Sequence, residues 1–136
     1  EIVVLLKEKA LEILNTTGDI IVGEEFVPAP VLRSRKIKEF KDEVTILKDF
    51  KEIRVEVKIE NKENRGFDLV IFVKDKLSNR IIKDLRVTLI KDDLELESYL
   101  SNYDKVVFEH ILAGKYIIEI SNIEDKIASI LLDVRQ

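Results

Sequence analysis

The chain has 136 residues, of which 46% are hydrophobic and 37% are charged, and its net charge is −4. This length suits one domain with a short appendage, and the plentiful, regularly spaced apolar residues exclude an intrinsically disordered chain. The absence of cysteine excludes a disulfide framework, a thiolate zinc site and a cysteine nucleophile. The acidic balance opposes nucleic-acid binding, and no apolar run approaches the roughly 20 residues that span a bilayer.

Residues 1–18 are predicted to form an N-terminal amphipathic helix. Apolar residues recur there at spacings of three and four, the period of one helical face: Val3, Leu6, Ala10 and Ile13. This face is the predicted contact surface for a protein partner or for a second copy of the chain. Packing of the helix on the chain's own β domain is the alternative.

Residues 19–42 are predicted to be an extended linker or arm, because two prolines keep its backbone extended. Four basic side chains in this segment are candidate interaction residues: Arg33, Arg35, Lys36 and Lys38. Two interpretations stay open, namely contact with an acidic partner and pairing with the chain's own glutamate-rich strand 52–60. No nucleic-acid partner is expected, because neither a glycine-rich phosphate loop nor a set of stacking aromatic residues accompanies the cluster.

Residues 43–136 are predicted to form a mainly β domain, an antiparallel immunoglobulin-like or transthyretin-like β-sandwich of about seven strands. The clearest strand is 52–60, where apolar and charged residues alternate and one face is therefore expected to meet water. Residues 67–73 are apolar on both faces, which indicates a central strand. Short polar turns between the strands favour a sandwich over a parallel sheet.

Residues 84–120 carry a characteristic series of strands and turns. The residues that define the series are Val87, Thr88, Leu89, Ser98, Val106, Phe108, Ile111, Gly114, Tyr116 and Ile118. With these residues the chain resembles the carboxypeptidase regulatory-like and transthyretin-like β-sandwich modules over about residues 67–134. The resemblance implies an accessory or interaction module without catalysis of its own, within a larger bacterial protein. The expected helix and linker before a β domain also look like the arrangement in zinc-finger anti-sigma-like proteins, whose zinc motif is absent here.

Phe108, Gly114 and Tyr116 are predicted to have structural roles. Gly114 is expected to adopt a positive φ, which other residues resist. Tyr116 is expected to bury its ring and to direct its hydroxyl to a backbone group. Phe108 and Ile111 are expected to fill the core.

His110, the only histidine, follows Glu109, and adjacent residues of a strand point to opposite faces, so no acid–base pair is predicted. Several aspartates offer oxygen ligands for calcium, but aspartate is also common in turns: Asp75, Asp84, Asp92, Asp93 and Asp104. We therefore predict no catalytic residue, no metal and no cofactor, and we do not expect an enzyme.

The sequence predicts a non-catalytic structural or protein-interaction module. The alternative is a sandwich that binds a peptide, a carbohydrate or an acidic partner with the loops around Ser78, Asp92 and Asn102. The absence of methionine favours a fragment of a longer protein. Both the cytoplasm and the cell envelope stay open as locations.

Overall fold

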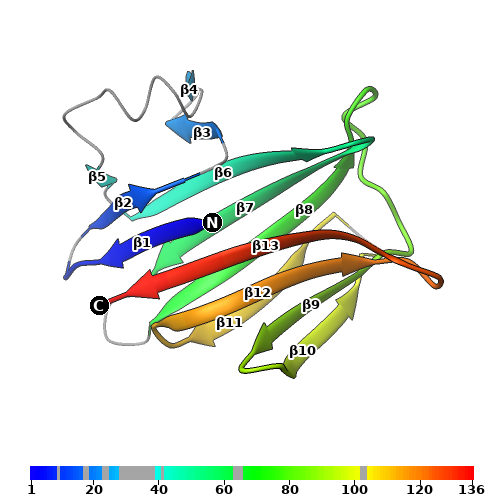
Figure 1. Cartoon of the computed structure of the whole chain (residues 1–136). Coiled ribbons are helices and arrows are strands. Elements are labelled where there is room, and N and C mark those ends of the chain that lie inside the picture. Colours follow the sequence, from blue (N-terminus) through cyan, green and yellow to red (C-terminus); the bar gives the residue numbers. More distant parts are fainter. Residues whose placement is uncertain are drawn as a thin grey trace.

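Every regular element in the described part of the chain is a β-strand, and the strands form two sheets packed face to face (Figure 1). The computed structural model describes residues 1–8, 10–16, 19–22, 25–27, 39–40, 42–62, 66–101 and 104–136. In these ranges no helix is long and apolar enough to cross a membrane.

The first sheet, called sheet A, has seven strands, and the second, called sheet B, has six among the residues described. In spatial order sheet A contains β10 (Leu94–Leu100), β9 (Arg86–Lys91), β12 (Gly114–Ser121), β13 (Lys126–Arg135), β1 (Ile2–Leu6), β2 (Leu11–Asn15) and β5 (Glu39–Phe40). In spatial order sheet B contains β11 (Val106–Ile111), β8 (Phe67–Asp75), β7 (Ile53–Asn61), β6 (Glu43–Phe50), β3 (Asp19–Val22) and β4 (Glu25–Val27).

The helix predicted over residues 1–18 is wrong, because this segment forms the hairpin of β1 and β2. The Lys7 N–H donates to the Ala10 carbonyl oxygen at 2.8 Å and closes the turn. The side-chain amide of Asn61 donates to the Lys7 and Ala10 carbonyl oxygens at 2.8 and 3.0 Å. Since Asn61 ends β7, these bonds tie the hairpin of sheet A to sheet B.

The pattern that suggests a helix also fits two short strands. Alternate residues of the hairpin are buried in the core: Ile2, Val4, Leu6, Leu11 and Ile13. The β-branched residues at positions 2–4 favour an extended backbone. Burial between the two sheets favours strands over a helix here. In a strand every second side chain points to the same face, and this period of two buries more of the apolar residues than the spacing of three and four.

The sandwich is mixed rather than purely antiparallel, because β1 pairs with β13 in parallel and places Val4 opposite Val134. The described residues also form thirteen strands, where about seven were expected. Much of the difference lies before residue 43, where β1 to β5 stand in place of the expected helix and the expected linker or arm. Core residues on both sides of position 43 belong to one cluster.

The described residues of segment 19–42, which was expected as a linker or arm, form three short strands. β3 pairs with β6 and extends sheet B, whereas β5 pairs with β2 and extends sheet A. The four basic candidates of this segment lie outside the described residues: Arg33, Arg35, Lys36 and Lys38.

β7 shows the alternation expected from its sequence, with Val55, Val57 and Ile59 fully buried. On its outer face Arg54 binds Asp49 through two hydrogen bonds of 2.8 and 3.2 Å, and Lys74 of β8 lies 2.7 Å from Glu56. The bonds from Arg54 hold the pKa of Asp49 below its usual value. Charged side chains of this outer face therefore find partners within sheet B itself.

The core lies between the inner faces of the two sheets. β8 lies between β7 and β11, as expected for a strand that is apolar on both faces, and Leu69, Ile71 and Val73 point into the core. They share one buried cluster with Ile118 of β12 and Ile130 of β13 in the facing sheet. This shared interior holds the two layers together, because burial of apolar surface is the main favourable contribution to folding.

The two neighbouring residues Ile13 and Leu14 distinguish the strand from the predicted helix. We expect Ile13→Ala to lower the free energy of unfolding by about 2–4 kcal/mol, because Ile13 is only 2% exposed. Leu14 is 40% exposed, so the matched variant Leu14→Ala should cost less than about 1 kcal/mol. Urea denaturation measures both values, and similar losses at the two positions would contradict the strand assignment.

Of the two glycines that the structure describes, Gly66 has a positive φ, at 86°, whereas Gly114 does not have the positive φ expected from the sequence. A Cβ atom at Gly66 would overlap the backbone carbonyl oxygen of Ile111, at the end of β11. At Gly114 the nearest atom would be the side-chain Nζ of Lys91 at 3.2 Å, which can move away. The backbone requirement for glycine therefore lies at Gly66.

We expect Gly66→Ala to reduce the free energy of unfolding by about 2–4 kcal/mol, through its positive φ and the overlap with Ile111. Gly114→Ala, the matched control, should change it by less than about 1 kcal/mol. Denaturant titrations of both variants provide the measurement. A larger loss at Gly114 than at Gly66 would refute this assignment.

Candidate functional site

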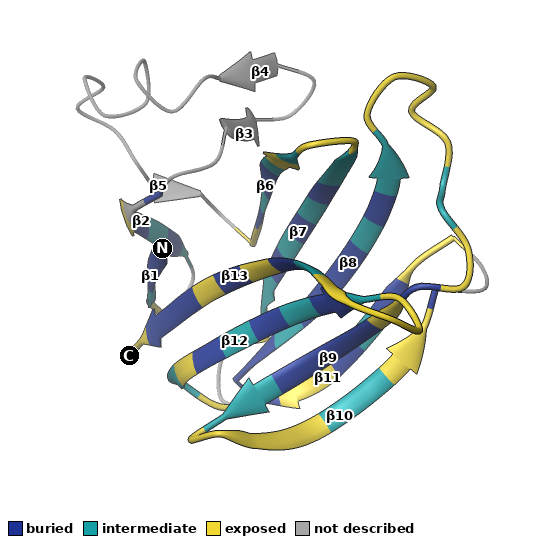
Figure 2. Ribbon diagram, turned by 45° about the vertical axis from the view of Figure 1, so that its right-hand side comes forward, coloured by how far each residue is buried: buried dark blue, intermediate teal, exposed yellow. Residues whose placement is uncertain are grey.

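β10, at one edge of sheet A, has no buried residue. Four large apolar side chains on it are exposed: Leu94 at 68%, Leu96 at 49%, Tyr99 at 44% and Leu100 at 45%. In Figure 2 much of this strand is yellow, the colour of exposed residues. Its only strand partner in the part of the chain that the structure describes is β9, so one side of its backbone lies open.

The turn between β9 and β10 consists of Asp92 and Asp93, whose φ angles are 52° and 64°. Two consecutive left-handed residues between the paired Lys91 and Leu94 form a two-residue hairpin turn of type I′. Aspartate tolerates this conformation better than most residues other than glycine. The turn therefore places two carboxylates beside the start of the edge strand.

The register with β9 fixes which way the side chains of β10 point. Tyr99 lies opposite the buried Val87 and faces the core side, where its ring centroid is 5.6 Å from that of Phe108. Ser98 lies opposite Thr88, with 2.8 Å between their hydroxyl oxygens, on the outer face of sheet A. Leu100 lies two residues farther along, on the same outer face.

The N-terminal half of β10 is less regular. Its register with β9 shifts between Glu95 and Glu97, which leaves Leu96 as the extra residue of a β-bulge. A bulge bends the strand and interrupts its ladder, and native proteins use such bulges on edge strands to hinder unwanted pairing.

The negative charge of the chain is concentrated around β10. Residues 92–109 contain six carboxylates and one lysine, a formal charge of −5, whereas the whole chain carries −4. The hydroxyl of Tyr99 donates to Glu97 Oε1 at 2.7 Å. This hydrogen bond, the charge of Glu97 and the charge of Glu109 all raise the pKa of Tyr99. The exposed apolar edge is thus also an acidic one.

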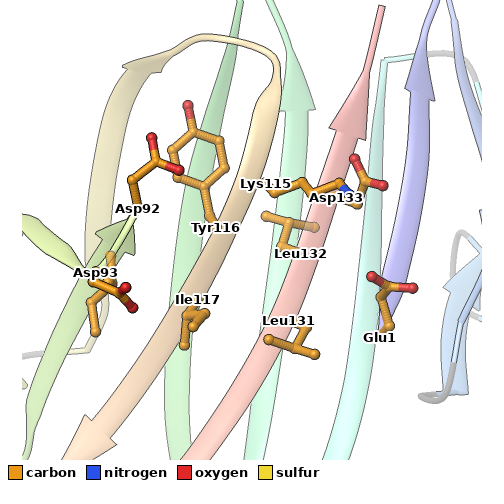
Figure 3. Close-up of a pocket in the computed structure, with 10 residues that line it drawn as sticks. Glu1, Asp92, Asp93, Lys115, Tyr116, Ile117, Leu131, Leu132 and Asp133 are labelled. Atoms are coloured by element: carbon orange, nitrogen blue, oxygen red, sulfur yellow. The ribbon is translucent and has the colours of Figure 1, made fainter.

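A shallow groove of about 300 Å³ adjoins the Asp92–Asp93 turn on the outer face of sheet A. Figure 3 shows Ile117 and Leu131 at its centre, between Asp93 on one side and Glu1 on the other. Leu131 is 48% exposed. The groove therefore continues the exposed apolar and acidic character of the hairpin towards the middle of the sheet.

Asp133 at the end of this groove is 5% exposed. Its Oδ2 atom accepts hydrogen bonds from Nε and an Nη atom of Arg135 at 3.2 and 3.1 Å, and in the sheet Asp133 lies opposite Lys115. These interactions compensate for the cost of burying a carboxylate. They favour a structural role for Asp133 over a catalytic one.

A second cavity, of about 730 Å³, lies at the opposite end of the fold, between the β6–β7 turn and the β12–β13 turn. Its apolar lining consists of Phe50, Ile53 and Ile127, which are partly buried and pack against the core. Charged and polar residues complete the lining: Lys51, Glu52, Asn122, Asp125 and Lys126. We refer to it below as the inter-sheet cleft.

Glu109 and His110 lie at a bulge of β11, so their side chains do not alternate between the two faces of the sheet as expected. Both stand opposite Asp68, and His110 has a φ of 57°. The His110 N–H donates to Asp68 Oδ1 at 3.0 Å, and His110 Nε2 lies 3.8 Å from Glu109 Oε2. The side chains of His110 and Glu109 are 63% and 65% exposed, so both lie on the open surface rather than in a pocket.

Two of the loops that the sequence suggests for ligand binding, those around Ser78 and Asp92, lie far apart. Ser78 follows β8 at the end of the fold near the β6–β7 turn, where the backbone N–H of Lys76 donates to the carbonyl oxygen of Glu52. Asp92 follows β9 at the opposite end. Asn102 lies outside the described residues. The Asp75 carboxylate accepts the N–H groups of Leu77 and Ser78, which lowers the pKa of Asp75. Within the described ranges, no group of three or more histidine, cysteine, aspartate or glutamate residues is arranged to hold a metal ion.

The apolar residues predicted as a contact surface belong mostly to the interior. Val3, Leu6 and Ile13 are 5%, 7% and 2% exposed, and Ala10 lies half-buried in the β1–β2 turn. Two of the expected structural residues, Phe108 and Tyr116, are buried. Phe108 is fully buried, and Tyr116 packs edge-on against the ring of Phe67.

The comparisons with known proteins add no relative. No family model matches the chain, and neither the curated proteins nor the solved structures contain a match.

Sequence reasoning missed the exposed edge at β10, although the signal was visible. The segment 94–97 reads Leu-Glu-Leu-Glu, an alternation typical of a strand with one apolar face. The sequence alone does not reveal that this strand lies at an edge, because that position depends on which strands pair with it.

The hydroxyl of Tyr116 donates to the Leu112 carbonyl oxygen at 2.6 Å, a backbone contact of the kind expected from the sequence. We expect Tyr116→Phe to lower the free energy of unfolding by about 1–2 kcal/mol, because it leaves a part-buried carbonyl without this donor. Tyr99→Phe removes an exposed bond to Glu97 and should cost less than about 0.5 kcal/mol. Thermal or urea unfolding distinguishes the two, and equal losses would contradict a special role for Tyr116.

Proposed function

We propose that the chain is a non-catalytic protein-interaction module and that the edge of β10 is its contact surface. The observation that carries the proposal is the exposure of four large apolar side chains on one edge strand. Exposed strand edges with apolar side chains are typical places for an additional strand to bind. The surface differs from the one expected from the sequence, because the N-terminal residues named there are largely buried.

The resemblance to carboxypeptidase regulatory-like and transthyretin-like modules is part of this proposal. Three observations support it: Phe108 is buried, Ile111 is buried, and the Tyr116 hydroxyl donates a hydrogen bond to the Leu112 carbonyl oxygen. A hydroxyl bond of this kind, from a tyrosine near the start of a strand to the backbone a few residues upstream, is common in β-sandwiches. The resemblance implies an accessory role beside other domains.

The inter-sheet cleft favours a second candidate function, the binding of a small ligand. Its volume of about 730 Å³ falls within the usual range for ligand sites, and its lining combines three apolar side chains with polar ones. The two candidates differ in location, because the cleft and the Asp92–Asp93 turn lie at opposite ends of the strands.

The test compares three variants of the tagged chain in cell extract of the source organism. In Leu96→Lys/Leu100→Lys two exposed leucines of β10 are replaced, and in Leu77→Lys/Ile123→Lys two exposed residues of distant turns are replaced. We expect proteins identified by mass spectrometry to be retained by the wild type and by the turn variant. The edge variant should lose at least nine-tenths of them, because buried charge in an interface is costly.

Ile127→Lys in the cleft completes the set, and unchanged melting temperatures establish that all three variants are folded. Retention that is lost with Ile127→Lys but not with the edge variant would favour the cleft. Equal retention by all variants, or no retention by the wild type, would refute the proposed interaction surface.

A further inference from the structure

The open side of β10 presents main-chain N–H and carbonyl groups along the length of the strand. The strand has seven residues, and its partner β9 occupies one side only among the residues described. A peptide that adds to such an edge gains affinity from main-chain bonds, while its alternate side chains contact the two faces and determine specificity. The chemistry of the two faces therefore indicates which peptide fits.

Both faces of this edge combine carboxylates with apolar surface. On the core side Tyr99 bonds Glu97, and the charge of Glu109 on β11 also reaches Tyr99. On the outer face Glu95 lies opposite Ile90, and Leu100 lies on the same face. An added strand would thus meet negative charge and apolar side chains together.

A second copy of the chain fits this edge poorly. Pairing of two β10 strands would bring together two segments that each carry a formal charge of −5. Like charges across strands are destabilising. Opposite charge on the partner removes this obstacle.

Resting on the interaction function proposed above, we propose that the edge of β10 binds an extended peptide segment in which pairs of basic and pairs of apolar residues alternate. Each face of the added strand then carries both kinds of side chain. The basic side chains pair with the carboxylates of the edge, and the apolar ones cover its exposed leucines. The peptide backbone continues sheet A as an additional strand.

The probe is a fluorescein-labelled octapeptide of alternating lysine pairs and valine pairs, so that each face of the strand carries both residue types. Its binding is measured by fluorescence anisotropy at 150 mM salt. We expect it to bind the wild-type chain and to bind Glu95→Lys/Glu97→Lys at least tenfold more weakly. The matched control, Glu8→Lys/Glu124→Lys, has the same change in net charge at exposed positions away from β10, and its affinity should change less than threefold.

Three further peptides test the extended form and the charge. One has glutamate in place of lysine, one has proline at its centre, and one has the same composition in separate lysine and valine blocks. We expect each to bind at least tenfold more weakly than the alternating peptide, because proline removes a ladder donor and the block order breaks the alternation along each face. Hydrogen exchange should show slower exchange of β10 amides when the alternating peptide is bound.

Absence of binding, equal binding of the glutamate or proline peptide, or an equal effect of the control variant would overturn the proposal. A wild-type dimer in light scattering that Glu95→Lys/Glu97→Lys dissociates would make a second copy the occupant and would also overturn it. The interaction function is judged separately, by whether Leu96→Lys/Leu100→Lys loses the retained proteins. A functional edge with a different partner is thereby distinguished from an edge without function.

Discussion

The structure depends on the parallel pairing of β1 with β13, which joins residues near the two ends of the sequence in one sheet. Ile2 lies opposite Leu132 and Val4 opposite Val134, so the inward-facing residues of the two strands continue one apolar surface. β2 and β5 reach sheet A only through β1. Figure 1 shows β1 beside β13, with β6 and β7 in the layer behind. Without this pairing, the part of the core over β6 would lose its cover.

The same arrangement leaves the two sides of sheet A chemically different. On the side of β1 and β2, Asn61 bonds the hairpin turn and connects it to sheet B. On the other side β10 ends the sheet with exposed leucines and with carboxylates from its turn and its own strand. A segment that carries more negative charge than the whole chain is a strong local feature, because it acts on a partner at the range of a few ångströms where screening by salt is incomplete. The edge of β10 therefore combines exposed apolar side chains with a local excess of negative charge.

The sequence predicted individual strands well and their arrangement poorly. The alternation in β7 and the two-sided apolar pattern of β8 follow from local order, and both patterns agree with the positions of these strands in sheet B. Residues 2–15 were misread because short apolar segments fit a helix and a hairpin about equally well, and only the facing sheet distinguishes them. Gly66 was overlooked in favour of Gly114, because the need for glycine at Gly66 comes from the carbonyl of Ile111, 45 residues later in the sequence.

The sequence by itself determined that this is a β-rich chain with a large apolar core, with Tyr116 and Phe108 in packing positions and without cysteine chemistry. Alternation, turn residues and composition are local properties, so they can be read from a single chain. Only the tertiary structure decided that β1 pairs with β13, that the N-terminal apolar residues are core, and that β10 is an edge. Those outcomes depend on contacts between residues far apart in sequence, whose free energy comes from the surface that the assembled sheets bury together.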